Sequence, residues 1–175
     1  DGAQGVDKQD FDDIESKGIE TFVQEISEEL KAFSYKPKAV KRVWIEKANG
    51  KLRPLGIPTI KDRVVQASCK MVIEPIFEAD FSENSYGFRA EKNAGQAISQ
   101  IKAHLKQGFT EVYDADLSAY FDTIPHDKLM KALKERISDH RVLRLIKMWL
   151  QSPVSENGRI TGGKSTTCGT PQGGV

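Results

Sequence analysis

The chain has 175 residues, of which 38% are hydrophobic, and a formal net charge of +1. This length is sufficient for one medium domain or for two small lobes that share a core. We expect no membrane partner and no secretory signal, because no apolar run approaches the roughly 18 residues of a membrane helix and the first residues carry neither a basic end nor an apolar stretch.

The charged residues are segregated along the chain. Residues 1–30 carry 2 basic and 10 acidic groups, residues 31–70 carry 11 and 2, and residues 71–175 carry 13 of each. The middle segment therefore has a local field suited to a polyanion. The alternative is a basic face that contacts only water, since runs of Lys and Arg are commonly solvated.

The first half of the chain predicts a helix, a hairpin and a second helix. Apolar residues recur at helical spacing from Ile19 to Phe33. The stretch AVKRVWIEKANGKLRPLGIPTI then has two β-rich runs on either side of Asn-Gly, which is the strongest short hairpin signal. From Thr59, with Asp62 as a possible N3 partner, the sequence predicts a helix that Pro75 ends or kinks.

The second half predicts helices, a strand and another hairpin. A helix is expected from Asn93 to Lys106, with Gly108 as its stop, and TEVYDADL predicts a strand over residues 110–117. The stretches HDKLMKALKERI and VLRLIKMWL predict two short helices. A hairpin through Asn-Gly at 157–158 and a glycine-rich end, CGTPQGGV, follow.

The stretch GRITGGKS, from Gly158 to Ser165, matches the phosphate-binding pattern G-x-x-x-x-G-K-S/T. A working P-loop needs a buried strand before the glycines and a helix that begins at the Lys-Ser pair. The residues before Gly158 are polar and contain Pro153, and the glycines and proline after Ser165 forbid a helix of useful length. We therefore interpret GRITGGKS as a solvated hairpin arm.

Two carboxylates, Asp114 and Asp116, stand two residues apart in VYDADLSAYFDTI. On a strand they share one face, beside apolar neighbours, where carboxylates are costly unless they are paired or bound to metal. This pattern favours a hard cation such as Mg²⁺, which prefers oxygen ligands. The alternative is that one Asp pairs with a cation and the other caps the following turn.

Four motifs in order indicate a family. Counting from Asp116, the stretch DLSAYFD, the later GTPQGG, the earlier KANGKLRPLGIP and the intervening SYGFR together resemble the reverse transcriptases, most closely those of bacterial group II introns. The resemblance covers nearly the whole chain and implies an α+β fold: the fingers and part of the palm of a right-hand polymerase, with β-hairpins, a short palm strand and several packed helices. It places the N-terminal extension and fingers in residues 1–89, the first palm segment in 90–124 and a second fingers segment in 125–175.

The resemblance also implies roles for individual residues. It makes Asp116 the catalytic carboxylate and a Mg²⁺ ligand, with the carbonyl of Leu117 as a further ligand. The nucleotide-binding positions that it implies are Lys47, Arg53, Ala119, Tyr120, Phe121 and Gln172, with Lys51 as a substitute on the fingers hairpin. Phe121 is expected to pack beneath the sugar and exclude a 2′ hydroxyl, and a core aromatic is its alternative. The template-binding positions are Lys61, Arg63 and Arg89, which would act through sequence-independent electrostatics.

The resemblance also implies a maturase role, in which the protein binds the parent intron RNA and assists its splicing. The expected partners are therefore an RNA template, a DNA primer, dNTPs and the parent group II intron RNA. The two cysteines lack zinc or disulfide spacing, in keeping with a reducing, bacterial cytoplasm. Family members continue after GTPQGG to a Tyr-x-Asp-Asp motif, so we expect that the 175-residue chain does not polymerise on its own.

Three alternatives remain open. The first is an RNA-binding splicing cofactor that does not use its polymerase centre. The second is another bacterial reverse transcriptase class, such as the retron, diversity-generating or CRISPR-associated enzymes. The third is a basic module that binds nucleic acid without catalysis. The sequence leaves the oligomeric state open.

Overall fold

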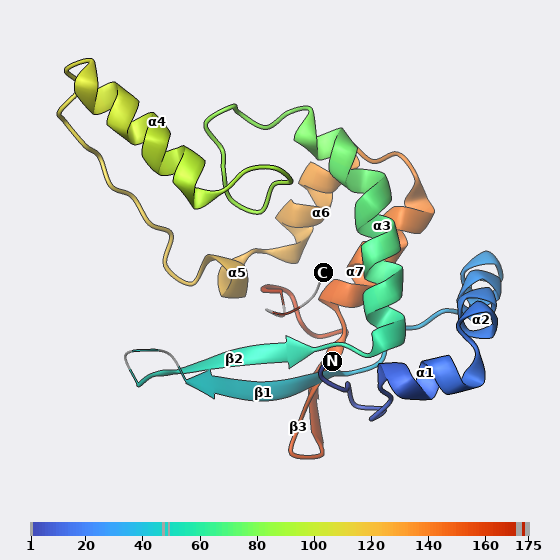
Figure 1. Ribbon diagram of the computed structural model, residues 1–175. Helices are drawn as coiled ribbons and strands as arrows, with labels where there is room; N and C mark the ends of the chain where they lie inside the picture. Colours follow the sequence, from blue (N-terminus) through green and yellow to red (C-terminus); the bar gives the residue numbers. More distant parts are fainter. Residues whose placement is uncertain (1, 47, 49, 171–172, 174–175) are drawn as a thin grey trace. The chain divides into compact units, whose positions relative to one another are not determined.

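The computed structural model describes residues 2–46, 48, 50–170 and 173. The chain divides into two compact units: unit 1 contains Asp1–Met71 and Ala119–Val175, and unit 2 contains Val72–Ser118. In chain order (Figure 1) the helices and strands are α1 Phe11–Lys17, α2 Ile19–Lys31, β1 Val40–Glu46, β2 Leu52–Ile57, α3 Ile60–Glu78, α4 Ala94–Lys106, α5 Tyr120–Thr123, α6 His126–Lys134, α7 His140–Leu150, β3 Pro153–Glu156 and β4 Arg159–Gly162.

Unit 1 contains a four-stranded sheet with the order β2-β1-β3-β4. β1 and β2 are antiparallel, with Glu46 opposite Leu52, while β1 and β3 are parallel. β3 and β4 form the second hairpin, and its two turn residues, Asn157 (φ 49°) and Gly158 (φ 79°), have the positive φ that a type I′ turn requires. Both hairpins predicted from Asn-Gly are therefore confirmed.

The P-loop-like stretch forms exposed strand β4 and the loop that follows it. No helix begins at Lys164 or Ser165 among the residues that the structure describes. A phosphate-binding loop depends on the N-terminus of such a helix. The interpretation as a hairpin arm is confirmed.

Helices α2, α3 and α7 pack around one core cluster in unit 1. Ile26, Tyr35 and Val65 are its buried centre, each at most 5% exposed. The packing partners are the partly buried residues Phe22, Leu30, Val64, Leu145, Met148 and Trp149. The predicted amphipathic helix near the N-terminus is thus confirmed as a packing element. A shorter helix precedes it: α1 begins after Asp10, which forms a capping box with Asp13.

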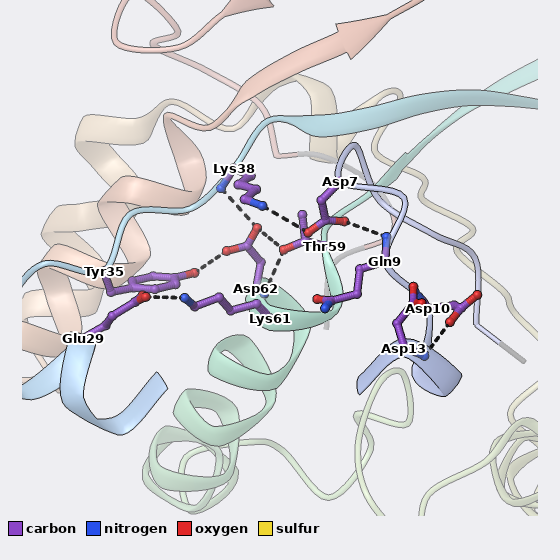
Figure 2. A network of polar contacts seen from close by, with 10 residues as sticks. All are labelled: Asp7, Gln9, Asp10, Asp13, Glu29, Tyr35, Lys38, Thr59, Lys61 and Asp62. Atoms are coloured by element: carbon purple, nitrogen blue, oxygen red, sulfur yellow. Dashed lines mark hydrogen bonds and ion pairs between the residues drawn. The ribbon is translucent and has the colours of Figure 1, made fainter. Parts of the chain in front are cut away.

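Asp62 lies at the centre of a buried polar network, shown in Figure 2. Its carboxylate accepts hydrogen bonds from the Tyr35 hydroxyl (2.7 Å), the Thr59 hydroxyl (2.7 Å) and the backbone N–H of Lys38 (3.2 Å). Tyr35 in turn accepts one from Nε1 of Trp149 at 3.1 Å, and burial raises the pKa of its hydroxyl. The network ties the segment after α2, the start of α3 and helix α7 together, so Asp62 does more than the helix cap that the sequence predicts.

Unit 2 contains the end of α3, an ordered loop and α4. Asn93 and Gln96 form a capping box at the start of α4, as the predicted boundary implies. Residues 110–117, by contrast, form no strand, which corrects the prediction for TEVYDADL. The physical reason is that a strand needs a hydrogen-bonding neighbour, and these residues pair with no strand of the described sheet. Val112 and Leu117 are accordingly 79% and 71% exposed.

Among the described residues, no helix has both the length and the apolar character needed to cross a membrane. Pro75 lies inside α3 rather than at its end, so the helix continues to Glu78.

Candidate nucleotide and nucleic-acid site

Two motifs that are far apart in the sequence lie side by side in unit 1. The backbone N–H of Thr170 donates to the carbonyl of Phe121 (2.8 Å), and that of Gly169 donates to the carbonyl of Ile124 (2.9 Å). Nε2 of His126, at the start of α6, forms a further hydrogen bond of 2.6 Å to the carbonyl of Gly169. These hydrogen bonds thus join the SAYFD segment around α5 to Gly169 and Thr170, the first two residues of the GTPQGG motif.

Glycine is required at two points of this motif because neighbouring backbone approaches too closely for a side chain. Gly169 has φ +80°, and a Cβ there would lie 2.7 Å from the carbonyl oxygen of Asp122. Gly173 has φ +114°, and a Cβ there would collide with the carbonyl oxygen of Gly56 and with Leu55 in β2. Positive φ and close backbone contact are the two situations that select glycine. The motif therefore contacts both α5 and the β1–β2 hairpin.

Ala119, Tyr120 and Phe121 are all exposed at this junction. Ala119 has the left-handed conformation (φ 49°, ψ 35°) at the N-cap of α5, which is uncommon for a residue other than glycine. Phe121 is 44% exposed and its ring meets that of Tyr120 edge to face at 5.6 Å. The described structure thus does not make Phe121 a core aromatic.

Arg53 is exposed on β2, where it faces Ile45 across the hairpin. Lys47 and Gln172, the other nucleotide-binding positions expected from the sequence, lie outside the described residues. A small cavity of about 200 Å³ opens in unit 1; its lining includes Arg42, Pro54, Gly56, Asp122, Gly169 and Thr170. This volume is below the roughly 300 to 1,000 Å³ of small-molecule sites, so the small cavity alone does not enclose a whole nucleotide.

The proposed metal ligands, Asp116 and Leu117, belong to unit 2, whereas the segments from Ala119 onward belong to unit 1. Asp114 and Asp116 are both exposed. No group of three or more His, Cys, Asp or Glu side chains that could hold a metal occurs in the part of the chain that the structure describes. One carboxylate and a carbonyl rarely hold a hydrated Mg²⁺. The described residues alone therefore do not make a complete magnesium site.

Two of the expected template-binding cations contact the N-terminal segment. Lys61 forms an ion pair with Glu29, on α2. Nη2 of Arg63 donates to the carbonyl of Ala3 at 2.9 Å, and its guanidinium lies over the ring of Phe11 at 5.8 Å. Both contacts attach residues of the acidic N-terminal region to the start of α3.

Arg89 is engaged inside unit 2, where its side chain is 6% exposed. Nε and Nη2 donate to one carboxylate oxygen of Glu78 (2.9 and 2.6 Å), and Nη1 donates to the carbonyls of Ser82 and Ser85 (2.7 and 2.8 Å). The Arg89 guanidinium lowers the pKa of Glu78 through these hydrogen bonds. Arg89 thus holds the loop between α3 and α4 in place.

A larger cavity of about 820 Å³ lies between α6 and α7, beside the loop that follows β4. We call it the α6–α7 pocket. The sequence predicted these two short helices but not the pocket between them. The available signal was the i, i+3 spacing of basic residues on each helix, at Lys131 and Lys134 and at Arg144 and Lys147, which places each pair on one face.

Comparison with known proteins gives one family and several relatives. The family described as reverse transcriptase (RNA-dependent DNA polymerase) matches residues 45–175. Protein YkfC of Escherichia coli is 44% identical over 157 residues, which cover 87% of this chain and 40% of YkfC. The group II intron-encoded protein LtrA of Lactococcus lactis is 33% identical over 166 residues, 94% of this chain and 27% of LtrA.

A solved structure has the same fold. It is a chain of the "Partial Cas6-RT-Cas1--Cas2 complex", with a TM-score of 0.56 and 23% identity, and the match covers 89% of this chain and 27% of that one. The chain thus spans 40% or less of the length of each of these proteins. The match confirms the α+β fold class expected from the sequence.

Proposed function

Because this chain belongs to the reverse transcriptase family, we propose that the protein containing it is the RNA-directed DNA polymerase of a group II intron, which adds dNTPs to a primer 3′ end in the bacterial cytoplasm. The observation that carries the proposal is the backbone pairing of the SAYFD segment with the GTPQGG motif. The two motifs that contact the incoming nucleotide in our assignment are neighbours in space. Residues 1–89 are then the N-terminal extension and fingers, 90–124 the first palm segment and 125–175 the second fingers segment.

The nucleotide-binding residues divide by what each side chain offers. Arg53 presents a planar fork to phosphate oxygens, and Lys47 supplies a mobile point charge from the same hairpin. The exposed ring of Phe121 is available to lie under the sugar and favour dNTPs. The left-handed turn at Ala119 starts α5, so backbone N–H groups there can face a triphosphate. Gln172 is assigned to the nucleotide's sugar.

Asp116 is the catalytic carboxylate of the proposal, and the carbonyl of Leu117 assists it as a ligand. Polymerases of this kind use two Mg²⁺ ions, which stabilise charge on the entering and leaving oxygens. The described residues offer no complete site, so we expect weak Mg²⁺ binding and no polymerisation by the 175-residue chain on its own.

Primer extension on an RNA template, with the full-length protein, dNTPs and Mg²⁺, tests the proposal. Asp116→Ala is expected to lower the rate by more than about 100-fold, since even outer-shell partners of metal sites are typically worth 10- to 100-fold. Asp114→Ala is the matched control, because it removes an exposed carboxylate from the same segment and is expected to keep its activity. Equal activity of the Asp116→Ala variant and the wild type would contradict the assignment.

An RNA-binding splicing cofactor is the second candidate function. It is favoured by the similarity to a protein encoded by a group II intron. In that case the parent intron RNA is the partner, and Asp116→Ala leaves splicing intact. Intron RNA structure beside the gene supports either of these functions, whereas its absence favours another bacterial reverse transcriptase class.

A further inference from the structure

The α6–α7 pocket has a basic rim. Its lining includes Lys131 and Lys134 of α6, Lys147 of α7 and Lys164 of the loop after β4. Asp127 is the one acidic residue in the described lining. Four ammonium groups around one cavity of about 820 Å³ produce a field that concentrates anions.

These four lysines have no hydrogen-bond or ion-pair partner among the described residues. Lys61 and Arg89, by contrast, are bound to Glu29 and Glu78. A cation that is already paired has little charge left for an external phosphate, whereas an unpaired lysine retains all three donors. Four unpaired lysines around one cavity therefore make the α6–α7 pocket a site of attraction for a polyanion in unit 1.

The floor of the α6–α7 pocket is apolar, with Met130, Leu143 and Leu150 in its lining. A cationic rim over an apolar floor matches a nucleic-acid strand, whose phosphates need cations and whose bases have apolar faces. The pocket also adjoins the nucleotide-site region, because Leu150 and Thr166 line both it and the small cavity. A nucleic-acid strand that reaches the small cavity can therefore continue into the α6–α7 pocket.

We propose that the α6–α7 pocket binds the sugar-phosphate backbone of an RNA strand. Taking RNA as the polyanion rests on the proposed function; the location of the site rests on the unpaired lysines. Lys164, the lysine of the P-loop-like stretch, contributes as a simple point charge on the rim, without a phosphate-binding loop. The site is separate from the residues assigned to the triphosphate.

The test is RNA binding by the 175-residue chain, measured by fluorescence anisotropy with a labelled single-stranded RNA. The variant carries Lys131→Gln, Lys147→Gln and Lys164→Gln. We expect its affinity to fall at least about tenfold and its salt slope to decrease by about 2, since each neutralised phosphate of a single strand contributes about 0.7. The control variant carries Lys102→Gln, Lys106→Gln and Lys128→Gln, which remove the same charge from exposed positions outside the pocket lining, and it should change affinity by less than about twofold.

A third variant, with arginine at the three pocket positions, keeps the charge and should keep the affinity. An equal loss in the pocket and control variants overturns the proposal, as does no loss in the pocket variant. A pocket variant that loses binding to single-stranded DNA of the same sequence, or to an acidic peptide, but retains binding to RNA also overturns it. Each variant is confirmed as folded if its midpoint of thermal unfolding equals that of the wild type.

Primer extension by the full-length protein separates this proposal from the proposed function. If the wild-type full-length protein synthesises no DNA but the pocket variant binds RNA more weakly, the pocket assignment stands and the polymerase proposal fails. If the wild-type full-length protein synthesises DNA but the pocket variant binds RNA as the wild type does, the polymerase proposal stands and the pocket assignment fails.

Discussion

Replacement of Tyr35 by Phe tests whether the buried network around Asp62 stabilises unit 1. The substitution removes one oxygen atom and keeps the aromatic ring in the core cluster. Tyr35 is 2% exposed, so water has little access to the position that the hydroxyl leaves. The carboxylate of Asp62 loses a donor at 2.7 Å, and Nε1 of Trp149 loses its acceptor at 3.1 Å.

The expected cost follows from these two losses. A hydrogen bond to a charged group contributes about 1.5–3 kcal/mol, and a buried donor left without an acceptor costs about 1–3 kcal/mol. Trp149 is only partly buried, so its share lies at the low end. We therefore expect Tyr35→Phe to lower the free energy of unfolding by about 2–4 kcal/mol, a large part of the roughly 5–15 kcal/mol of a typical domain.

Urea denaturation followed by tryptophan fluorescence measures this change. Trp44 and Trp149 both belong to unit 1, so the signal reports the unfolding of that unit. Tyr113→Phe is the matched control, because Tyr113 is 93% exposed and belongs to unit 2. The control should change stability by less than about 0.5 kcal/mol. A loss below about 1 kcal/mol for Tyr35→Phe, with an unchanged denaturant slope, would refute the reasoning.

Three further predictions concern local features. Gly169→Ala places a Cβ 2.7 Å from the Asp122 carbonyl at φ +80°; it should destabilise unit 1 by more than about 1 kcal/mol in the same urea assay, and wild-type stability would contradict the close approach. Arg89→Lys cannot reproduce the guanidinium's four hydrogen bonds, so limited proteolysis of the loop between α3 and α4 should become faster. The pKa of Glu78 is lowered from 4.5, so the protection of this loop from proteolysis by the Arg89–Glu78 ion pair is complete above pH 4.5. It is lost as the pH falls through the lower, folded-state pKa, and a wild-type loop that is still protected at pH 2 would argue against the ion pair. Asn93→Ala should cost α4 about 1 kcal/mol, visible as faster amide exchange in its first turn, and unchanged exchange would contradict the capping box.

Local chemistry made much of the fold predictable. The two Asn-Gly turns fix their hairpins because few residues adopt positive φ, and Asn157 and Gly158 both do so. Thr59 and Asn93 mark helix starts because their side chains accept from backbone N–H groups that the helix leaves free. The order of the motifs predicted the family, and the match over residues 45–175 confirms it.

Long-range partners were not predictable from local pattern. The strand expected at residues 110–117 is absent. The alternation of apolar and polar residues indicates that a segment can form a strand, but it does not show whether another strand is present to pair with it. Asp62 was expected to act within its own helix, yet its carboxylate also accepts a hydrogen bond from Tyr35, which lies 27 residues away in sequence. Ile98 and Ile101 have the spacing of an apolar helix face on α4, yet both are more than half exposed.

The basic run of residues 31–70 shows why a sum of charges does not locate a nucleic-acid surface. That segment has the largest positive excess, yet Lys61 is paired with Glu29 of the acidic N-terminal region. The field of such a pair falls off faster than that of a single charge, and salt screens what remains beyond about 8–10 Å. Residues 71–175 carry no net charge, but four lysines around the α6–α7 pocket have no partner among the described residues. Unpaired charges within reach of a phosphate determine binding, so the salt dependence of RNA affinity should follow the lysines of the pocket more closely than Lys61.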